Sequence, residues 1–131
     1  MGSQQLLLII LGTIVVGIMV IVGISLFNDH AAATNRDAVA NDLVHAASYA
    51  QMWRKKPVTQ GGGGGSFAGF NLRWVFRDLE NTNGTYSIFG SGSDSLIIIE
   101  GVGSQPGYDG TEPVKVSIRV FDVRTEVNSV N

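Results

Sequence analysis

The residues that most often perform catalysis or bind metals are few in this chain. None of the 131 residues is a cysteine, which excludes disulfides, thiolate metal sites and cysteine nucleophiles. The two histidines, His30 and His45, both lie in a stretch with a helical pattern, away from any serine or carboxylate pair that would complete a catalytic set. We interpret them as polar residues on a helix face, and we predict no enzymatic activity, no catalytic residue and no cofactor.

Carboxylates that could bind a metal lie in the second half of the chain. Asp94, Glu100, Asp109 and Glu112 fall in or near the loops of a predicted sheet. A dedicated calcium loop places oxygen ligands at alternating positions, and the segment DGTE that starts at Asp109 lacks that spacing. We predict no metal site.

The segment Asn83-Gly84-Thr85 matches the acceptor pattern for N-glycosylation. The same Asn-Gly pair is typical of a tight turn between two strands, which explains its presence without any sugar. The turn is predicted, and glycosylation is left open.

The charge distribution gives no sign of a nucleic-acid surface. Nine Lys and Arg residues against eleven Asp and Glu residues give a formal net charge of −2. The only basic cluster is Arg54, Lys55 and Lys56. Because nucleic-acid binding surfaces are basic, we predict no nucleic-acid partner.

The N-terminal part of the chain is apolar over the length of a membrane span. From Leu6 to Phe27 there is no charged residue, and the first charge is Asp29. A helix over this run would be roughly 33 Å long, enough for a hydrocarbon core of about 30 Å. A cleaved signal peptide is disfavoured, because no Lys or Arg precedes the run and the run is longer than such a signal requires.

The helical pattern then continues in an amphipathic form. Val39, Leu43, Ala46, Ala50 and Trp53 step by four, three, four and three residues, which places them on one face of a helix. The helix is expected to end at Lys56, after a basic last turn and before a proline. We predict one helix from about Ser3 to Lys56, roughly 80 Å long.

The rest of the chain reads as a loop followed by strands. The glycine-rich segment from Pro57 to Ser66 is typical of a flexible, exposed loop. Period-two alternation and apolar runs predict strands over 70–76, 85–89, 96–99 and 114–120, the last continuing through Phe121 and Val123. Short loops between them favour an antiparallel meander.

The apolar face of this sheet needs a cover, and the amphipathic half of the helix can provide it. We predict an α+β fold in which one long N-terminal helix, apolar and then amphipathic, packs on a four-stranded antiparallel meander sheet. The expected parts are an apolar half-helix (1–28), an amphipathic half-helix (29–56), a glycine-rich loop (57–69) and a β-domain (70–131). The residues predicted to pack between helix and sheet are Val39, Leu43, Ala46, Ala50, Trp53, Phe70, Leu72, Trp74 and Phe76.

This organisation resembles the type IV pilins and the related pseudopilins of secretion systems. If Met1 is the first residue of the mature chain, Gln5 stands where most family members carry a glutamate, and the apolar stretch from Leu6 to Ile10 matches the segment that follows. The family's glutamate is thought to pair with the N-terminal amine of a neighbouring subunit, whereas a glutamine offers only neutral hydrogen bonds. Val22 stands where a helix-breaking proline is usual, and Gly17 and Gly23 could permit local unwinding there. An alternative, with Ser3 as the first residue, stays open.

The resemblance implies that the apolar half-helix is first a membrane anchor and then a packing surface between subunits. The residues expected in a filament core are Gln5, Leu6, Ile9, Gly12, Thr13, Val16, Gly17, Val20, Gly23 and Phe27.

We therefore expect the major structural subunit of an extracellular type IV pilus-like filament, anchored in the inner membrane before assembly. Its partners would be copies of itself, the membrane and an assembly machinery. Two alternatives remain: a secretion-system pseudopilin, and a single-pass membrane-anchored binding module. The module reading has to explain why no Lys or Arg flanks the start of the apolar run.

Overall fold

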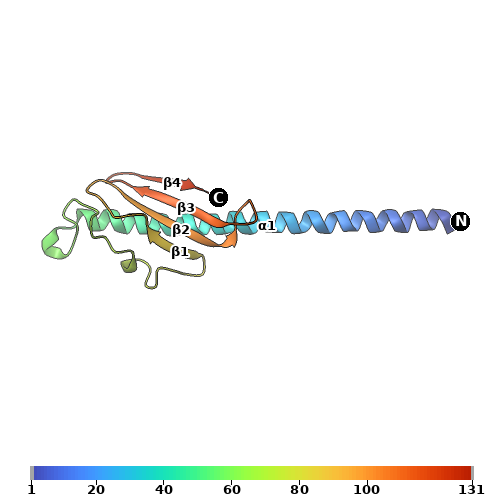
Figure 1. Cartoon of the computed structure of the whole chain (residues 1–131), viewed down its shortest axis with the longest axis horizontal. Coiled ribbons are helices and arrows are strands. Elements are labelled where there is room, and N and C mark those ends of the chain that lie inside the picture. The colour runs from blue at the N-terminus through green and yellow to red at the C-terminus, as the bar shows by residue number, and fades with distance from the viewer. Residues whose placement is uncertain (1, 131) are drawn as a thin grey trace.

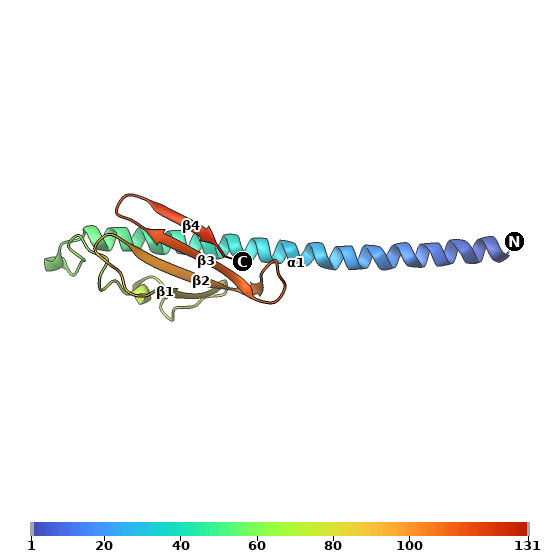
Figure 2. The same cartoon turned by 45° about the horizontal axis from the view of Figure 1, so that its top comes forward.

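The computed structural model describes residues 2–130 and consists of one long helix and a four-stranded sheet. Helix α1 spans Gly2–Lys55, and the strands are β1 (Gly84–Ile88), β2 (Ile97–Pro106), β3 (Pro113–Val120) and β4 (Thr125–Ser129). The first half of α1 projects beyond the domain, and its second half lies along the sheet (Figures 1 and 2). This confirms the predicted α+β fold. Met1, the predicted first residue of the mature chain, and Asn131, the predicted end of the β-domain, lie outside the described residues.

Helix α1 ends within one residue of the predicted position, and the glycine-rich segment completes its end. The backbone N–H of Gly63 donates to the carbonyl of Trp53 (2.8 Å), and the N–H of Gly65 donates to that of Arg54 (2.7 Å). The last carbonyls of a helix have no partner within the helix, so these bonds satisfy them. The segment predicted to be a flexible loop is exposed, but it folds back onto the helix and caps it.

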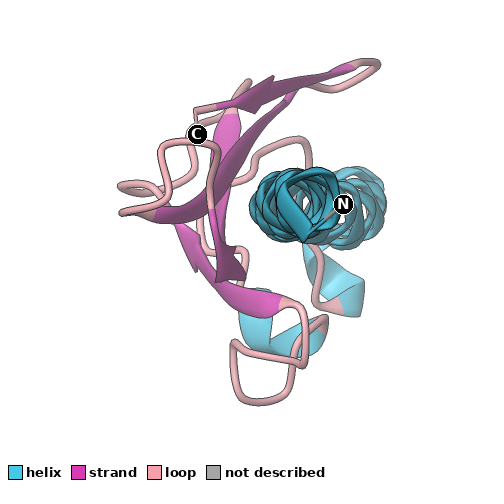
Figure 3. Ribbon diagram, turned by 90° about the vertical axis from the view of Figure 1, so that its right-hand side faces the viewer, coloured by secondary structure: helices cyan, strands magenta, loops and turns pink. Residues whose placement is uncertain are grey.

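The sheet is an antiparallel meander in the order β1-β2-β3-β4, as predicted. Tyr86 of β1 pairs with Gly101 of β2, and Ile99 of β2 pairs with Ile118 of β3. Viewed along the helix, the sheet curves around one side of α1 (Figure 3). Alternate side chains of the strands therefore point at the helix, and the opposite face points to solvent.

The strand predicted over 70–76 was wrong. Leu72–Trp74 forms a short 3₁₀ helix, in which the side chain of Asn71 accepts a hydrogen bond from the N–H of Arg73 (2.9 Å). The N–H of Phe76 then donates to the carbonyl of Leu72 (2.9 Å). A polar side chain that caps the local turn thus overrides the alternating pattern, because it gives the backbone a local alternative to strand pairing.

The last predicted strand was also wrong beyond Val120. At Phe121 the chain turns, with the N–H of Phe121 bonded to the carbonyl of Arg124 (2.9 Å), and it returns as β4. The apolar alternation runs through this turn without a glycine or proline to mark it. The count of four strands was right, although the first predicted strand contains a 3₁₀ helix instead and β4 was not predicted.

The core lies between the sheet and the second half of α1, and it is closed at one end by the segment 67–76. Its most buried side chains from the helix are Ala32, Val39, Leu43, Ala46, Ala47 and Ala50. Those from the sheet are Tyr86, Ile97, Ile99, Val114, Val116, Ile118 and Val120. The small alanines bring the helix axis close to the sheet, which leaves little internal space.

Candidate functional site

The most unusual surface of the molecule is the free half of α1. Every residue from 2 to 30 is exposed, and an 18-residue window of this helix has a mean hydropathy of 3.1 with no buried residue. By length and composition, α1 is able to cross a membrane. An exposed apolar surface of this size is unstable in water and requires lipid or protein around it.

The residues expected in a filament core all lie in this exposed half. Because α1 is continuous, Gln5, Ile9, Val16, Val20 and Phe27 recur within a band of about 60° around the helix axis. The hydroxyl of Thr13 donates to the carbonyl of Ile9 (2.8 Å), so its proton needs no acceptor from a neighbouring chain. The set of ten forms one broad face of the helix, and its contacts with other chains stay a prediction.

The glycines of this half leave room for close packing. A β-carbon added to Gly12, Gly17 or Gly23 would meet no atom within 4 Å. The helix runs through Gly17 and Gly23 without interruption. Glycine at such a surface lets another helix backbone approach closely, which is how apolar helices associate in lipid.

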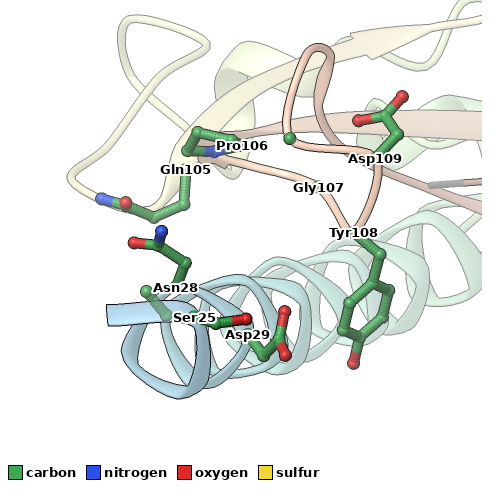
Figure 4. A pocket seen from close by; sticks show the side chains of 10 residues that line it. Ser25, Asn28, Asp29, Gln105, Pro106, Gly107, Tyr108 and Asp109 are labelled. Carbon is green, nitrogen blue, oxygen red and sulfur yellow. The ribbon is translucent and has the colours of Figure 1, made fainter. Parts of the chain in front are cut away.

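A pocket of about 280 Å³ lies where α1 leaves the domain (Figure 4). Ser25, Asn28 and Asp29 form its helix side, and the segment from Gln105 to Gly110 forms the other. The aromatic ring of Tyr108 lies beside the helix, 4.3 Å from the guanidinium carbon of Arg36. The loop between β2 and β3 therefore holds α1 at the point where it becomes free.

The four carboxylates considered for metal binding are not brought together. The carboxylate of Asp109 accepts hydrogen bonds from the N–H groups of Thr111 (3.0 Å) and Glu112 (3.1 Å), and these bonds stabilise the turn over residues 109–112. Glu112 also lies 3.6 Å from the ammonium of Lys115. Across residues 2–130 no group of three or more His, Asp or Glu side chains is arranged to hold a metal ion.

Both histidines occupy exposed positions of α1, His30 at the end of the free half and His45 on the half that packs on the sheet. The ring of His45 contacts that of Tyr49 edge to face, at 5.0 Å between centroids. His30 lines a shallow groove with Phe27 and Asn83. Both positions match the interpretation of polar residues on a helix face.

Most of the predicted helix-sheet residues are buried. Four helix residues are fully covered: Val39, Leu43, Ala46 and Ala50. The exposed fraction is 7% at Phe70, 3% at Leu72 and 9% at Phe76, and Trp53 is partly covered. Trp74 differs, since 55% of it is exposed. Phe70 and Trp74 contact Trp53 of the helix from the segment before β1 rather than from a strand.

Polar contacts that the sequence pattern did not single out also fix the helix to the sheet. The carboxylate of Asp42 accepts hydrogen bonds from the side-chain amides of Asn81 and Asn83 (both 2.9 Å) and from the hydroxyl of Tyr86. Burial by itself raises the pKa of the Asp42 carboxyl, but these hydrogen bonds outweigh it and the pKa lies below its ordinary value. Burial, and then the nearby Asp42 carboxylate, raise the pKa of Tyr86 far above its ordinary value.

These four residues, Asp42, Asn81, Asn83 and Tyr86, form what we call the Asp42 cluster. The cluster includes Asn83, the asparagine of the glycosylation motif. The amide of Asn83 is engaged with Asp42, and its backbone carbonyl accepts a hydrogen bond from the side chain of Asn35 (2.8 Å). The side chain that would carry a sugar is thus part of the contact between helix and sheet.

At the other end of α1, Arg54 and Gln51 hold the turn between β3 and β4. The guanidinium of Arg54 lies 2.7 Å from the carboxylate of Asp122, and the amide of Gln51 donates to the carbonyl of Phe121 (2.9 Å). The positions of Gln51 and Arg54 beside the apolar stripe mark them as able to make such contacts, but only the fold defines their partners.

No protein-family model, curated protein or solved structure matches this chain. The architecture of one long, apolar N-terminal helix and a four-stranded antiparallel sheet is compatible with that of the pilins. Its apolar half is compatible with anchoring in a membrane.

Proposed function

We propose that this chain is the major structural subunit of an extracellular type IV pilus-like filament. The observation that carries the proposal is the exposure of every residue from 2 to 30 on a helix whose other half is fixed to a folded domain. The domain needs none of these residues for its core. Their role is therefore contact with something outside the chain, first lipid and then the same half-helix of other copies.

The energetics favour assembly. Burial on the order of 1,000 Å² of apolar surface per subunit, at about 25 cal/mol per Å², is a large gross gain, although the loss of freedom on association offsets much of it. Because lipid tails are as apolar as leucine, association must also use close packing, for which Gly12, Gly17 and Gly23 leave space. The proposed role is mechanical, and no catalytic step is part of it.

Electron microscopy of material sheared from cells that produce the chain tests this proposal. Thin filaments that contain the chain are expected, and mass spectrometry of their N-terminus would identify the first residue. In the variant Val20→Asp, a charge in the packed core should abolish filaments, while Val20→Leu should retain them. Protein that stays in the membrane fraction without forming filaments would instead indicate an anchored module or a pseudopilin.

A further inference from the structure

The pocket where α1 leaves the domain has a defined depth relative to a membrane. Phe27 is the last residue of the apolar run, and Asp29, which lines the pocket, follows it by about 3 Å along the helix. A bilayer about 40–45 Å thick with a hydrocarbon core of about 30 Å has a headgroup layer of about 5–7 Å on each side. When the apolar half-helix crosses a bilayer, the pocket therefore lies in the headgroup layer.

The pocket presents polar groups from both of its sides. Figure 4 shows the side-chain amides of Asn28, on the helix, and Gln105, on the loop, pointing toward one another. Asp29 and Asp109 add carboxylates, and none of the described residues that line the pocket is Lys, Arg or His. The carboxylate of Asp109 is already bonded within its own turn, whereas that of Asp29 takes part in no ion pair among residues 2–130. Asp29 is therefore available to a cationic group.

A guanidinium lies next to the pocket and also lacks a carboxylate partner. Arg36 is seven residues after Asp29 and thus on nearly the same face of α1. Helix side chains lean toward the N-terminus, and its guanidinium carbon lies 4.3 Å from the ring centre of Tyr108, a lining residue. Within residues 2–130 Arg36 forms no ion pair, and its Nε is buried without a hydrogen-bond partner. The site thus offers one charge of each sign to a ligand.

The chemistry of the lining discriminates between lipid headgroups. Anionic glycerol headgroups would meet two carboxylates, so they are disfavoured. Choline has no N–H donor and is bound by cages of several aromatic rings. Tyr108 is the only aromatic residue among the described lining residues, and Arg36 already covers one of its faces. Ethanolamine ends in a primary ammonium with three N–H donors, as lysine does, and can therefore donate to a carboxylate.

We propose that this pocket binds the phosphoethanolamine headgroup of a membrane lipid. The ammonium donates to the carboxylate of Asp29, and the phosphate accepts from the guanidinium of Arg36 and from the amides of Asn28 and Gln105. Tyr108, which is 59% exposed, lies at the level where aromatic side chains are enriched at membrane surfaces. This inference rests on the membrane-anchored stage of the proposed function, and it holds whether or not the chain later forms filaments.

Zero-length coupling to the lipid tests the contact. The full chain is placed in nanodiscs that contain phosphatidylethanolamine, and a water-soluble carbodiimide is added. It joins a carboxylate to a primary amine in contact with it: the amide forms, and the carbodiimide takes up the lost water as a urea. Mass spectrometry should find the lipid amide on Asp29. Asp37, an exposed carboxylate about 12 Å further along the same helix, is the internal control. Equal coupling at both positions would overturn the proposal.

A second arm separates the lipid from its free headgroup. In detergent without lipid, soluble phosphoethanolamine should give no amide on Asp29, because only acyl chains hold a headgroup at this depth. Coupling of the soluble compound as efficient as that of the lipid would identify a site for a small solute and contradict the assignment to a lipid.

Headgroup preference gives an independent readout. Nanodiscs are made with equal amounts of phosphatidylethanolamine and phosphatidylcholine, and native mass spectrometry counts the lipids that stay bound to the released chain. The unmodified chain should retain more of the ethanolamine lipid. Asp29→Asn should lower the ratio roughly twofold to fivefold, the effect of one exposed ion pair. Asp37→Asn should leave the ratio unchanged.

The outcomes distinguish this inference from the proposed function. Equal retention of the two lipids by the unmodified chain, or a preference that persists in Asp29→Asn, would overturn the headgroup site and leave the membrane anchor intact. A chain that enters no bilayer of any composition would contradict the membrane-anchored stage itself, and the headgroup site with it.

Discussion

Gly103 of β2 lies against Asn35 of α1 so closely that a β-carbon added to the glycine would be 2.0 Å from the side-chain oxygen of Asn35. Asn35 is buried, and its amide spans the gap between helix and sheet. It donates to the carbonyl of Asn83 (2.8 Å) and accepts from the N–H of Gln105 (3.3 Å). One turn further along the helix, a β-carbon added to Gly101 would be 2.6 Å from the side chain of Val39. Two glycines in one strand therefore set how near the helix can come.

This contact predicts a specific coupling between two positions. Gly103→Ala should destabilise the domain by roughly 1–3 kcal/mol, because the methyl group collides with Asn35. In a chain that already carries Asn35→Ala, the same substitution should cost clearly less, since the colliding oxygen is gone. Denaturant unfolding of the full chain in detergent, followed by tryptophan fluorescence, gives all four free energies. Costs that simply add would contradict the contact.

The Asp42 cluster predicts a dependence of stability on acid. The folded-state pKa of Asp42 is lowered, so the folded chain holds this proton less readily than the unfolded chain, whose value is about 3.9. The stabilisation is therefore present above about pH 4 and is lost as pH falls through the lower, folded-state value. Asp42→Asn should unfold at a lower temperature near neutral pH, and the difference from the unmodified chain should shrink towards pH 3. Thermal melts at pH 3 to 7 measure this.

The control for that experiment is Asp37→Asn, which alters an exposed carboxylate on the same helix. Its melts should follow those of the unmodified chain at every pH. If Asp42→Asn keeps the same deficit at pH 3 as at pH 7, the ionised carboxylate is not what stabilises the cluster.

The helix was the most predictable element of this fold. Its apolar half and its stripe of Val39, Leu43, Ala46 and Ala50 are periodic over many residues, and long periodic signals average out local exceptions. A proline and a basic turn marked its end. The uninterrupted apolar run also predicted the exposed half of the helix. The residues expected in a filament core could be named because all of them lie on that one helix.

The segments without long periodicity were harder to predict. The alternation of Phe70, Leu72, Trp74 and Phe76 is short, and the segment instead forms a 3₁₀ helix capped by the side chain of Asn71. The turn at Phe121 is held partly by Gln51, seventy residues away. Such a contact depends on tertiary structure and leaves no local pattern in the sequence.

The polar contacts between the helix and the rest of the domain could not be predicted for the same reason. Asp42 and Arg54 border the apolar stripe, but apart from Tyr86 of β1 their partners are in loops whose positions only the folded chain defines. Trp74 was assigned to the interior, but the short 3₁₀ helix that carries it leaves it at the surface.

The contact between Tyr108 and Arg36 predicts a local change at the start of the free helix. Tyr108→Ala removes the ring under the guanidinium and should cost about 0.5–1 kcal/mol at this exposed site. Tyr108→Phe keeps the ring and should behave like the unmodified chain. Hydrogen exchange of the amides from 29 to 36 measures the effect, and faster exchange is expected in Tyr108→Ala only. Equal exchange in all three chains would show that the loop does not hold the helix.

The glycine-rich cap gives the last prediction. A β-carbon on Gly63 would be 2.1 Å from the carbonyl oxygen of Ser66 and 2.6 Å from the ring of Trp53. Gly63→Ala must therefore displace the loop and break the bond from the Gly63 N–H to the Trp53 carbonyl, at a cost of roughly 1–3 kcal/mol. The last turn of α1 should then fray, seen as faster hydrogen exchange over 52–56. Gln60→Ala, an exposed substitution in the same loop, should leave this exchange unchanged. A loop that is only a flexible tether would tolerate both substitutions equally, so a difference between them is what identifies the cap.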